Sequence, residues 1–265
     1  MLVNIHRVDN NIGDWMSSPL RFFSFPTRTT EVDILSCKSQ LQLDHDVLLG
    51  GGGLLARDSF APSMEYITEH TKGSLIGWGI GHNSYAAPNS PLSYPDYLRR
   101  FTLLGVRDDQ QGWPYVPCVS CMSPLFDHVS EIHHEAVVYR HGKKPWLLEV
   151  DPGIPMMENT AFTVQPADGE TAMDAAFRRT IDFLSSAEIV LTNSYHGMYW
   201  GILLAKKVLA VPFSTKFYGA KYKVPFLEFE DWRARVHEAE AYPDALEECR
   251  GLNRRFYGKV LTYLS

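Results

Sequence analysis

The sequence has no feature that would mark a membrane-spanning, secreted or nucleic-acid-binding protein. Its longest apolar runs are only a few residues, whereas a transmembrane helix needs about 20. No basic segment followed by a long apolar core stands at the start, so no secretory signal is expected. Basic residues are in deficit, with 25 Lys and Arg against 31 Asp and Glu in 265 residues, a net charge of −6. This balance argues against a nucleic-acid surface, and together these absences predict a cytoplasmic protein.

Cysteine is scarce as well, and its use fits a reducing compartment better than a disulfide framework. The four cysteines are Cys37, Cys118, Cys121 and Cys249. Cys118 and Cys121 form a lone C-x-x-C, whereas a structural zinc site needs a second pair or nearby histidines. We therefore expect buried thiols, with metal or redox use as the weaker alternative, and predict no metal site. His133, His134 and His141 lack regular carboxylate partners and are expected to face solvent.

Short β-rich runs alternate with helical stretches, which is typical of an α/β fold with parallel sheets. The strands expected in the first half are Leu2–Ile5, Val32–Leu35, Asp46–Leu49, Gly73–Gly77 and Phe101–Val106. Those expected in the second half are Glu135–Arg140, Trp146–Val150, Phe162–Gln165, Ala187–Thr192 and Val208–Phe213. Helices are expected over Ala172–Ser185, from about His196 to Lys207, and over Ala245–Leu264. The pattern predicts two Rossmann-like domains, residues 1–125 and 126–265, that face a cleft, with the last helix packing back on the first domain.

Four consecutive glycines, Gly50–Gly53, follow an apolar strand directly. Backbone without side chains can approach a ligand closely and present its N–H groups to it. The run is not G-x-G-x-x-G, and no Gly-Lys-Ser/Thr follows, so neither a dinucleotide fingerprint nor a P-loop applies. The alternative interpretation is a strand-to-helix turn that needs unusual dihedral angles.

Two charged residues follow strands of the first half, where loops line the ligand crevice of a parallel sheet. Asp14 could accept a hydrogen bond from a sugar hydroxyl, although composition alone favours a role in capping a helix. Arg107 could hold a carboxylate or phosphate through two hydrogen bonds. The alternative for Arg107 is a surface arrangement with Asp108 or Asp109.

Two further candidates follow strands of the second half. His196 lies in the first turn of an apolar helix, where the helix N-terminus lowers the pKa of a histidine unless an anion is bound. With a phosphate present, the imidazole becomes a proton donor near neutral pH. Lys216 begins a group with Lys221 and Lys223, of which one is expected to reach a phosphate and the others to be solvated.

Taken together, five motifs in this order resemble those of the polysaccharide pyruvyltransferase family. They are Asn11–Asp14, Gly50–Leu55, Gly79–Gly81, Val106–Asp108 and Ser194–Gly197, followed by Ala205–Pro212. The resemblance spans about residues 4 to 216. It implies a GT-B-like fold and transfer of the pyruvate unit of phosphoenolpyruvate onto a sugar of a bacterial exopolysaccharide repeat unit. The product is a cyclic ketal, for example 4,6-linked on mannose, galactose or glucose, and phosphate is released.

The resemblance also implies roles for individual residues. Phosphoenolpyruvate is expected on the second domain, held by a set of residues that comprises Arg107, Ser194, His196, Gly197 and Lys216. The glycine-rich and acceptor loops of the first domain are expected to contribute Asn11, Gly13, Asp14, Gly51, Gly52 and Gly53. Protonation of the methylene carbon of phosphoenolpyruvate needs an acid, for which His196 is expected, and Asp14 is the expected base for the sugar hydroxyl.

No cofactor is expected besides phosphoenolpyruvate as co-substrate. The implied acceptor is a lipid-linked oligosaccharide at the cytoplasmic face of the inner membrane, which the protein could contact peripherally. Aromatic residues are candidates for touching sugar or lipid, although core packing is the commoner fate. They are Trp15, Phe22, Phe23 and Phe25, of which the three phenylalanines lie close together and are a candidate acceptor lip.

Two departures from the family pattern leave other functions open. Tyr195 stands where many members have arginine, and the stretch after Asp108 is altered to Pro117–Pro124. One alternative is a nucleotide-sugar glycosyltransferase, in which Glu228 or Glu230 would bind the ribose. The other is a non-catalytic glycan-assembly protein, towards which Tyr195 is the only hint.

Overall fold

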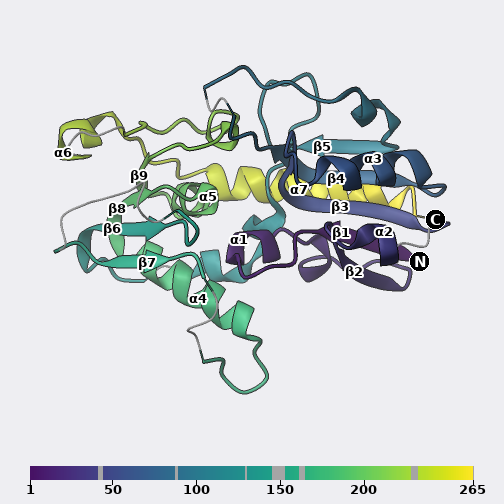
Figure 1. Cartoon of the computed structure of the whole chain (residues 1–265). Coiled ribbons are helices and arrows are strands. Elements are labelled where there is room, and N and C mark those ends of the chain that lie inside the picture. Colours follow the sequence, from purple (N-terminus) through teal and green to yellow (C-terminus); the bar gives the residue numbers. More distant parts are fainter. Residues whose placement is uncertain are drawn as a thin grey trace.

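The first half of the chain forms a five-stranded parallel sheet (Figure 1). The computed structural model describes residues 1–40, 44–86, 89–128, 130–144, 153–160, 165–227 and 232–264. The strands are β1 (Leu2–His6), β2 (Thr29–Asp33), β3 (Asp46–Leu55), β4 (Leu75–His82) and β5 (Leu103–Val106). Their order is β2-β1-β3-β4-β5, and every neighbouring pair is parallel. All residues of β1 and β4 are buried, as expected for a parallel sheet that is covered on both faces.

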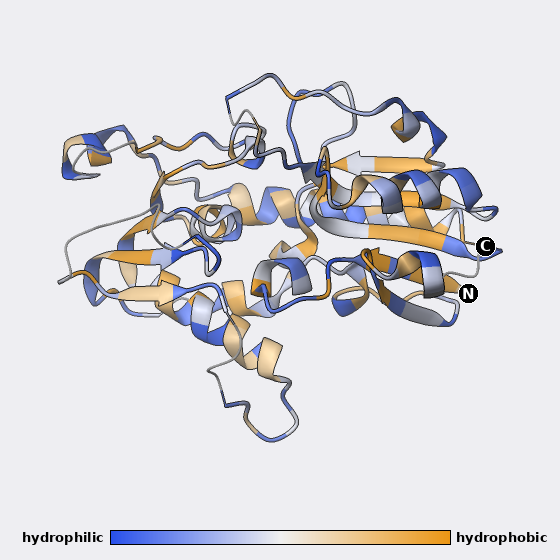
Figure 2. Cartoon of the chain, in the orientation of Figure 1, coloured by the Kyte–Doolittle hydropathy of each residue, from blue (hydrophilic) through white to orange (hydrophobic). Residues whose placement is uncertain are grey.

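The second half forms a separate four-stranded parallel sheet. Its strands are β6 (His134–Arg140), β7 (Met156–Glu158), β8 (Ala187–Thr192) and β9 (Lys207–Ala210), in the order β7-β6-β8-β9. The helices of the described chain are α1 (Ile12–Trp15), α2 (Cys37–Gln40), α3 (Ala61–His70), α4 (Ala172–Ser185), α5 (Tyr195–Leu203), α6 (Trp232–Arg235) and α7 (Ala245–Leu261). Hydrophobic residues gather along the strands of both sheets (Figure 2). The chain is therefore an α/β protein with parallel sheets.

Local sequence explains how the helices of the second sheet form. Thr171 accepts a hydrogen bond from the N–H of Asp174 and so caps α4, which buries Phe177, Ile181 and Leu184 at helical spacing. Helix α5 is buried along its whole length, which fits its apolar sequence. Both helices pack in the core cluster that includes Val137 and Tyr139 of β6 and Ala187 and Val190 of β8.

The C-terminal helix α7 contacts both sheets. Its first half packs with α5, where Ala245 and Cys249 join the core of the second sheet. Its second half lies on the first sheet, where Phe256 makes an edge-on ring contact with Trp78 and Asn253 accepts a hydrogen bond from the Trp78 indole at 2.7 Å. Figure 1 shows this helix running between the two halves. The helix thus packs back on the first half of the chain and joins the two cores.

Several expected elements differ in their bounds. Strand β3 runs on through the glycines to Leu55, with an irregular register after Gly52, because Gly51 and Gly52 adopt left-handed φ angles of +51° and +86°. Strand β2 begins at Thr29 and ends at Asp33, earlier than expected, and β7 was not expected. The expected strand 146–150 lies wholly outside the described residues, and so do residues 162–164 of the expected strand 162–165.

All four cysteines are free and buried, as expected. Within the described ranges, no group of three or more histidine, cysteine, aspartate or glutamate residues is placed to hold a metal ion. His133 and His134 are exposed as expected, whereas His141 is buried, so that expectation was wrong. The backbone N–H of His141 binds the side chain of Asn193, which holds the residue at the end of β6. No helix in the described part of the chain is long and apolar enough to span a bilayer.

Candidate functional site

The carboxyl ends of strands from both sheets converge on one small cavity of about 60 Å³. Because the side chains that follow parallel strands meet at one sheet edge, each half supplies part of the lining. The lining residues are Asn11, Asp14, Gly53, Asn83, Tyr85, Arg107, His141, Asn159, Ser194, Tyr195, His196 and Lys216. The cavity therefore brings together residues that lie up to 205 positions apart in the chain.

The structure assembles most, but not all, of the expected site residues. Seven of those named from the sequence line the cavity: Asn11, Asp14, Gly53, Arg107, Ser194, His196 and Lys216. Gly13, Gly51, Gly52 and Gly197 are outside the lining. Gly51 packs against Ser17, and Gly197 packs against Thr192 and Tyr139, so these two glycines serve close packing and do not line the cavity.

Arg107 is a buried cation that forms no ion pair with any residue that the structure describes. Its side chain follows β5 and is 2% exposed, and its Nε and Nη1 atoms have no hydrogen-bond partner among the described residues. Asp14 and Asp108 are the carboxylates within its electrostatic range. The surface arrangement with Asp108 or Asp109 does not form, because Arg107 and Asp108 are both buried; one Asp108 oxygen accepts hydrogen bonds from the His82 N–H and the Tyr94 hydroxyl. A buried guanidinium with free donors is costly, which is the condition expected of a site that binds an anion.

Two neighbours make room for the guanidinium and support it. A side chain at Gly81 would place its Cβ 2.4 Å from Arg107 Nε, so only glycine fits there. The Arg107 guanidinium carbon lies 3.8 Å from the centre of the Tyr195 ring, in a cation–π contact. Tyr195 therefore positions Arg107.

Lys216 is the second buried cation of the cavity, and it is 7% exposed. Burial and the nearby Arg107 lower the pKa of Lys216, while Asp14 opposes this change. The other two lysines of the group lie elsewhere, since Lys221 pairs with Glu248 and Lys223 donates to the Ala220 carbonyl. Lys216 is thus the lysine that reaches the cavity.

The side chain of Asp14 lines the cavity. It is not used to cap helix α1, because Asn11 caps that helix. Asn11 Oδ1 accepts from the N–H groups of Gly13 and Asp14, at 3.0 and 3.4 Å, and so caps α1. The capping role favoured for Asp14 was therefore wrong. Burial, together with Asp9, raises the pKa of Asp14, and Lys216 opposes the rise. A carboxyl group of this kind can exchange a proton near neutral pH.

His196 is buried at the N-terminus of α5, against α1. Burial, Arg107 and Lys216 together hold the pKa of His196 well below its usual range, so its imidazole is neutral in the empty cavity. A Cβ at Gly13 would lie 1.9 Å from His196 Nδ1, so the ring fits only because that position is glycine. On the other side of the ring, Ser17 Oγ and Cys118 Sγ lie 3.5 and 3.6 Å from Nε2.

Several lining residues were not identified from the sequence. Asn83 and His141 come directly after β4 and β6, so their position after a strand was an available signal. Asn159 follows β7 and donates to Asn11 Oδ1 at 2.8 Å. Asn83 and Asn159 each keep a buried carbonyl oxygen that no described residue donates to. Ser194 caps α5 through the N–H of Gly197, so its hydroxyl is partly committed to the fold.

The expected aromatic lip does not form. Phe23 stacks on Tyr257 with ring centres 4.5 Å apart, and Phe25 meets the same ring edge-on at 5.6 Å, so both pack against α7. Trp15 lies under the Arg21 guanidinium at 5.0 Å. Core packing accounts for these residues, and of the four only Phe22 lines a groove.

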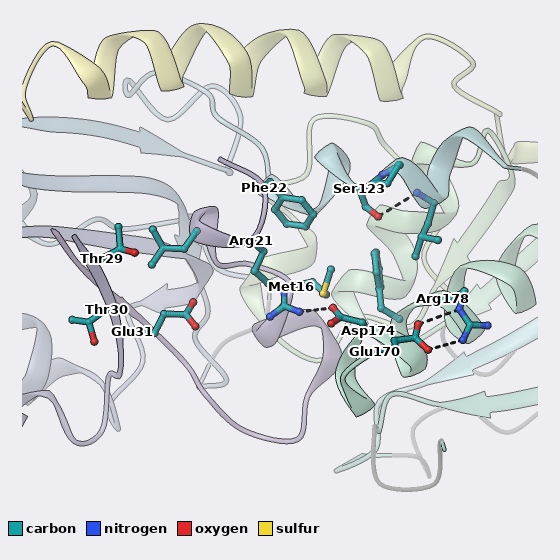
Figure 3. Close-up of a pocket in the computed structure, with 14 residues that line it drawn as sticks. Met16, Arg21, Phe22, Thr29, Thr30, Glu31, Ser123, Glu170, Asp174 and Arg178 are labelled. Atoms are coloured by element: carbon teal, nitrogen blue, oxygen red, sulfur yellow. Dashed lines mark hydrogen bonds and ion pairs between the residues drawn. The ribbon is translucent and has the colours of Figure 1, made fainter. Parts of the chain in front are cut away.

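That groove is larger, about 750 Å³, and lies between residues 16–31, residues 123–125 and helix α4 (Figure 3). Its charged groups are mostly paired with one another, Arg21 with Asp174 and Arg178 with Glu170. Glu31 adds a third carboxylate, so acids outnumber bases. The groove shares no lining residue with the small cavity, and its acidic balance disfavours a diphosphate.

Comparison with known proteins finds a structure with a similar fold but does not indicate an activity for this chain. No family model and no curated protein matches this chain. An uncharacterized protein from Klebsiella pneumoniae has a similar fold, with a TM-score of 0.52 and 14% identity over 85% of this chain and 92% of that one. An α-glucosyltransferase in complex with UDP and a mismatch-containing 13-mer DNA aligns at a TM-score of 0.41 and 10% identity, covering 99% of this chain and 94% of its own. The Klebsiella protein is similar to this chain in fold alone.

Proposed function

We propose that this chain is a pyruvyltransferase that binds phosphoenolpyruvate in the small cavity, between two Rossmann-like halves in a GT-B-like arrangement. One observation carries the proposal: Arg107 and Lys216, two buried cations from different halves, line one cavity with His196 and Asp14, and Arg107 has donors without partners. Such a site favours a small ligand with more than one negative charge.

Phosphoenolpyruvate fits this site in charge. It carries a carboxylate and a phosphate, so each buried cation can neutralise one anionic group. A single water needs at least about 10–15 Å³, so a cavity of about 60 Å³ is far too small for a nucleotide. This argues against the nucleotide-sugar alternative, whose candidate ribose ligands Glu228 and Glu230 lie outside the described residues.

The reaction needs one proton delivered and one removed. Protonation of the methylene carbon of phosphoenolpyruvate turns it into a methyl group and leaves positive charge at C2, which a sugar hydroxyl attacks. The C2–O bond to phosphate then breaks, phosphate leaves, and a second hydroxyl of the same sugar closes the ketal ring. In the proposed mechanism His196 supplies the proton, Asp14 accepts the hydroxyl proton, and Arg107 and Lys216 stabilise the anionic groups throughout.

The remaining parts of the proposal follow the family resemblance. The acceptor is the sugar of a lipid-linked oligosaccharide, presented from the first half of the chain near Asn11 and Gly53. The protein would work at the cytoplasmic face of the inner membrane, in peripheral contact with it. The acceptor sugar must carry two free hydroxyls that are close enough to close one ketal ring, such as those at positions 4 and 6.

A donor panel tests the proposal directly. Purified protein is incubated with sugar glycosides and either phosphoenolpyruvate or UDP-sugars, and products are read by phosphate release and by mass. A sugar product heavier by 70 Da, a pyruvate unit less water, is the expected outcome of ketal chemistry. Turnover of a UDP-sugar with none from phosphoenolpyruvate would establish the glycosyltransferase alternative, and failure of phosphoenolpyruvate to bind would remove the proposal.

A further inference from the structure

A second group of cations lies on the Tyr85 wall of the cavity. Arg57, which follows β3, places its guanidinium carbon 4.0 Å from the centre of the Tyr85 ring. Lys144, which follows β6 in the other sheet, places its ammonium 5.3 Å from the same ring. Tyr85 stacks on Phe213 at 5.7 Å, and Lys144 is 5.4 Å from that second ring. We call Arg57, Tyr85, Lys144 and Phe213 the Tyr85 collar.

The two collar cations have no carboxylate partner in the described part of the chain, although neighbouring cations do. Lys143, next to Lys144, pairs with Asp9 at 3.0 Å, and Arg7 pairs with Asp33. Arg57 and Lys144 are both half-buried, so neither is a freely solvated surface charge. A protein of net charge −6 that leaves two half-buried cations on one aromatic ring has positive potential there to attract an anion.

The collar lies outside the inner cavity. Tyr85 lines the cavity, but neither Arg57 nor Lys144 does, and the Tyr85 ring is the contact that both share. Both cations contribute to the lowered pKa of Lys216, so the collar is within electrostatic range of the inner site. An anion on the collar would therefore sit beside phosphoenolpyruvate and not in its place.

We propose that the Tyr85 collar is a second anion site, which binds the phosphate or diphosphate group of the acceptor while phosphoenolpyruvate occupies the inner cavity. The identity of the inner ligand rests on the proposed function, whereas the collar itself rests on its own unpaired cations. Because Arg57 and Lys144 come from different halves of the chain, an anion between them would also bring both halves together around the acceptor.

Inorganic pyrophosphate is the probe for this site. Its binding to protein saturated with phosphoenolpyruvate is measured by calorimetry for the wild type and for Arg57→Ala/Lys144→Ala. The double variant is expected to weaken pyrophosphate binding at least tenfold and to change phosphoenolpyruvate affinity less than twofold. Arg57→Lys/Lys144→Arg should restore most of the binding. Arg99→Ala/Arg100→Ala, which removes two exposed charges elsewhere, is the control and should bind as the wild type does.

Three results would overturn the collar: equal pyrophosphate binding by the wild type and the double variant, displacement of phosphoenolpyruvate by pyrophosphate, or loss of phosphoenolpyruvate binding in the double variant. In the phosphate-release assay, pyrophosphate should compete with the acceptor and not with phosphoenolpyruvate. Should the wild type fail to bind phosphoenolpyruvate, the proposed function falls, and the collar is then judged on pyrophosphate alone. The collar proposal is supported if pyrophosphate binding is lost in Arg57→Ala/Lys144→Ala and kept in Arg107→Met.

Discussion

Replacing Arg107 by methionine should make the empty protein more stable and abolish its response to phosphoenolpyruvate. Two nitrogens of Arg107 are buried without partners, and each such group costs about 1–3 kcal/mol. The cation–π contact with Tyr195 offsets about 0.5–2 kcal/mol of this cost. Methionine keeps most of the buried stem, so we expect a net gain in the free energy of unfolding, of up to about 5 kcal/mol.

Thermal unfolding with and without ligand measures both effects. Each kcal/mol corresponds to about 2–4 °C in Tm for a chain somewhat smaller than this one, so the variant should melt several degrees higher. Phosphoenolpyruvate at about 100 times its Kd should stabilise the wild type by about 2.7 kcal/mol and leave Arg107→Met unchanged.

Arg250 provides the control, since it is also buried but fully paired. Its guanidinium donates to the carbonyls of Cys121 and Ser123 at 3.0 and 2.9 Å and to the half-exposed Asp127 at 2.6 Å. Arg250→Met should therefore destabilise the fold, by about 1–3 kcal/mol, because it leaves the two carbonyls without their donor. If Arg107→Met lowers the Tm in the same way, or if it retains the ligand-induced shift, the guanidinium belongs to the fold and the reasoning about an anion site is refuted.

Three further predictions test the role of His196, its contact with Gly13 and the ion pair between His6 and Glu31. His196→Ala should fold normally and lose about 10²–10⁴ in phosphate release; near-normal turnover would exclude His196 as the acid. Gly13→Ala should displace the His196 imidazole and lower turnover more than tenfold. The control is Gly258→Ala, where a Cβ meets open space, and this variant should be neutral or slightly stabilising. Equal activity of the two variants would contradict the close contact between Gly13 and His196. The pKa of Glu31 is lowered to about 2, chiefly by His6, so this group adds stability above its unfolded value of 4.5 and loses it as pH falls towards 2. The wild type should therefore exceed Glu31→Gln in Tm at pH 6 and converge with it near pH 2, and a constant difference would contradict that assignment.

Position after a strand was the rule that made the site predictable. Arg107, His196 and Lys216 each follow a strand of a parallel sheet, and the edge where such strands end is where their side chains meet. Sequence periodicity found these strands because buried parallel strands form short, nearly continuous apolar runs bounded by turn residues. The same rule, applied further, would have included Asn83 and His141.

What the sequence did not show depends on contacts between distant segments. Whether Asp14 caps its helix or faces the cavity was decided by Asn11, whose amide is itself held by Asn159 from β7. No local pattern in residues 11–14 contains that information. The same holds for the aromatic residues near Phe23, whose packing against Tyr257 depends on where the C-terminal helix lies.

The surroundings of His196 favour its neutral imidazole, which is not the acid that the proposed reaction needs. Ligand binding must therefore come before protonation of His196. Burial first, and then the charges of Arg107 and Lys216, lower the pKa of His196, so neutralising the two cations removes part of what disfavours its protonated form. A ligand with two anionic groups cancels their repulsion and raises the pKa of His196 at the moment the acid is needed. Binding of phosphoenolpyruvate should therefore take up protons from solution near neutral pH, and calorimetry in buffers of different ionisation enthalpy measures that number. Proton release on binding would contradict this account of how the acid is generated.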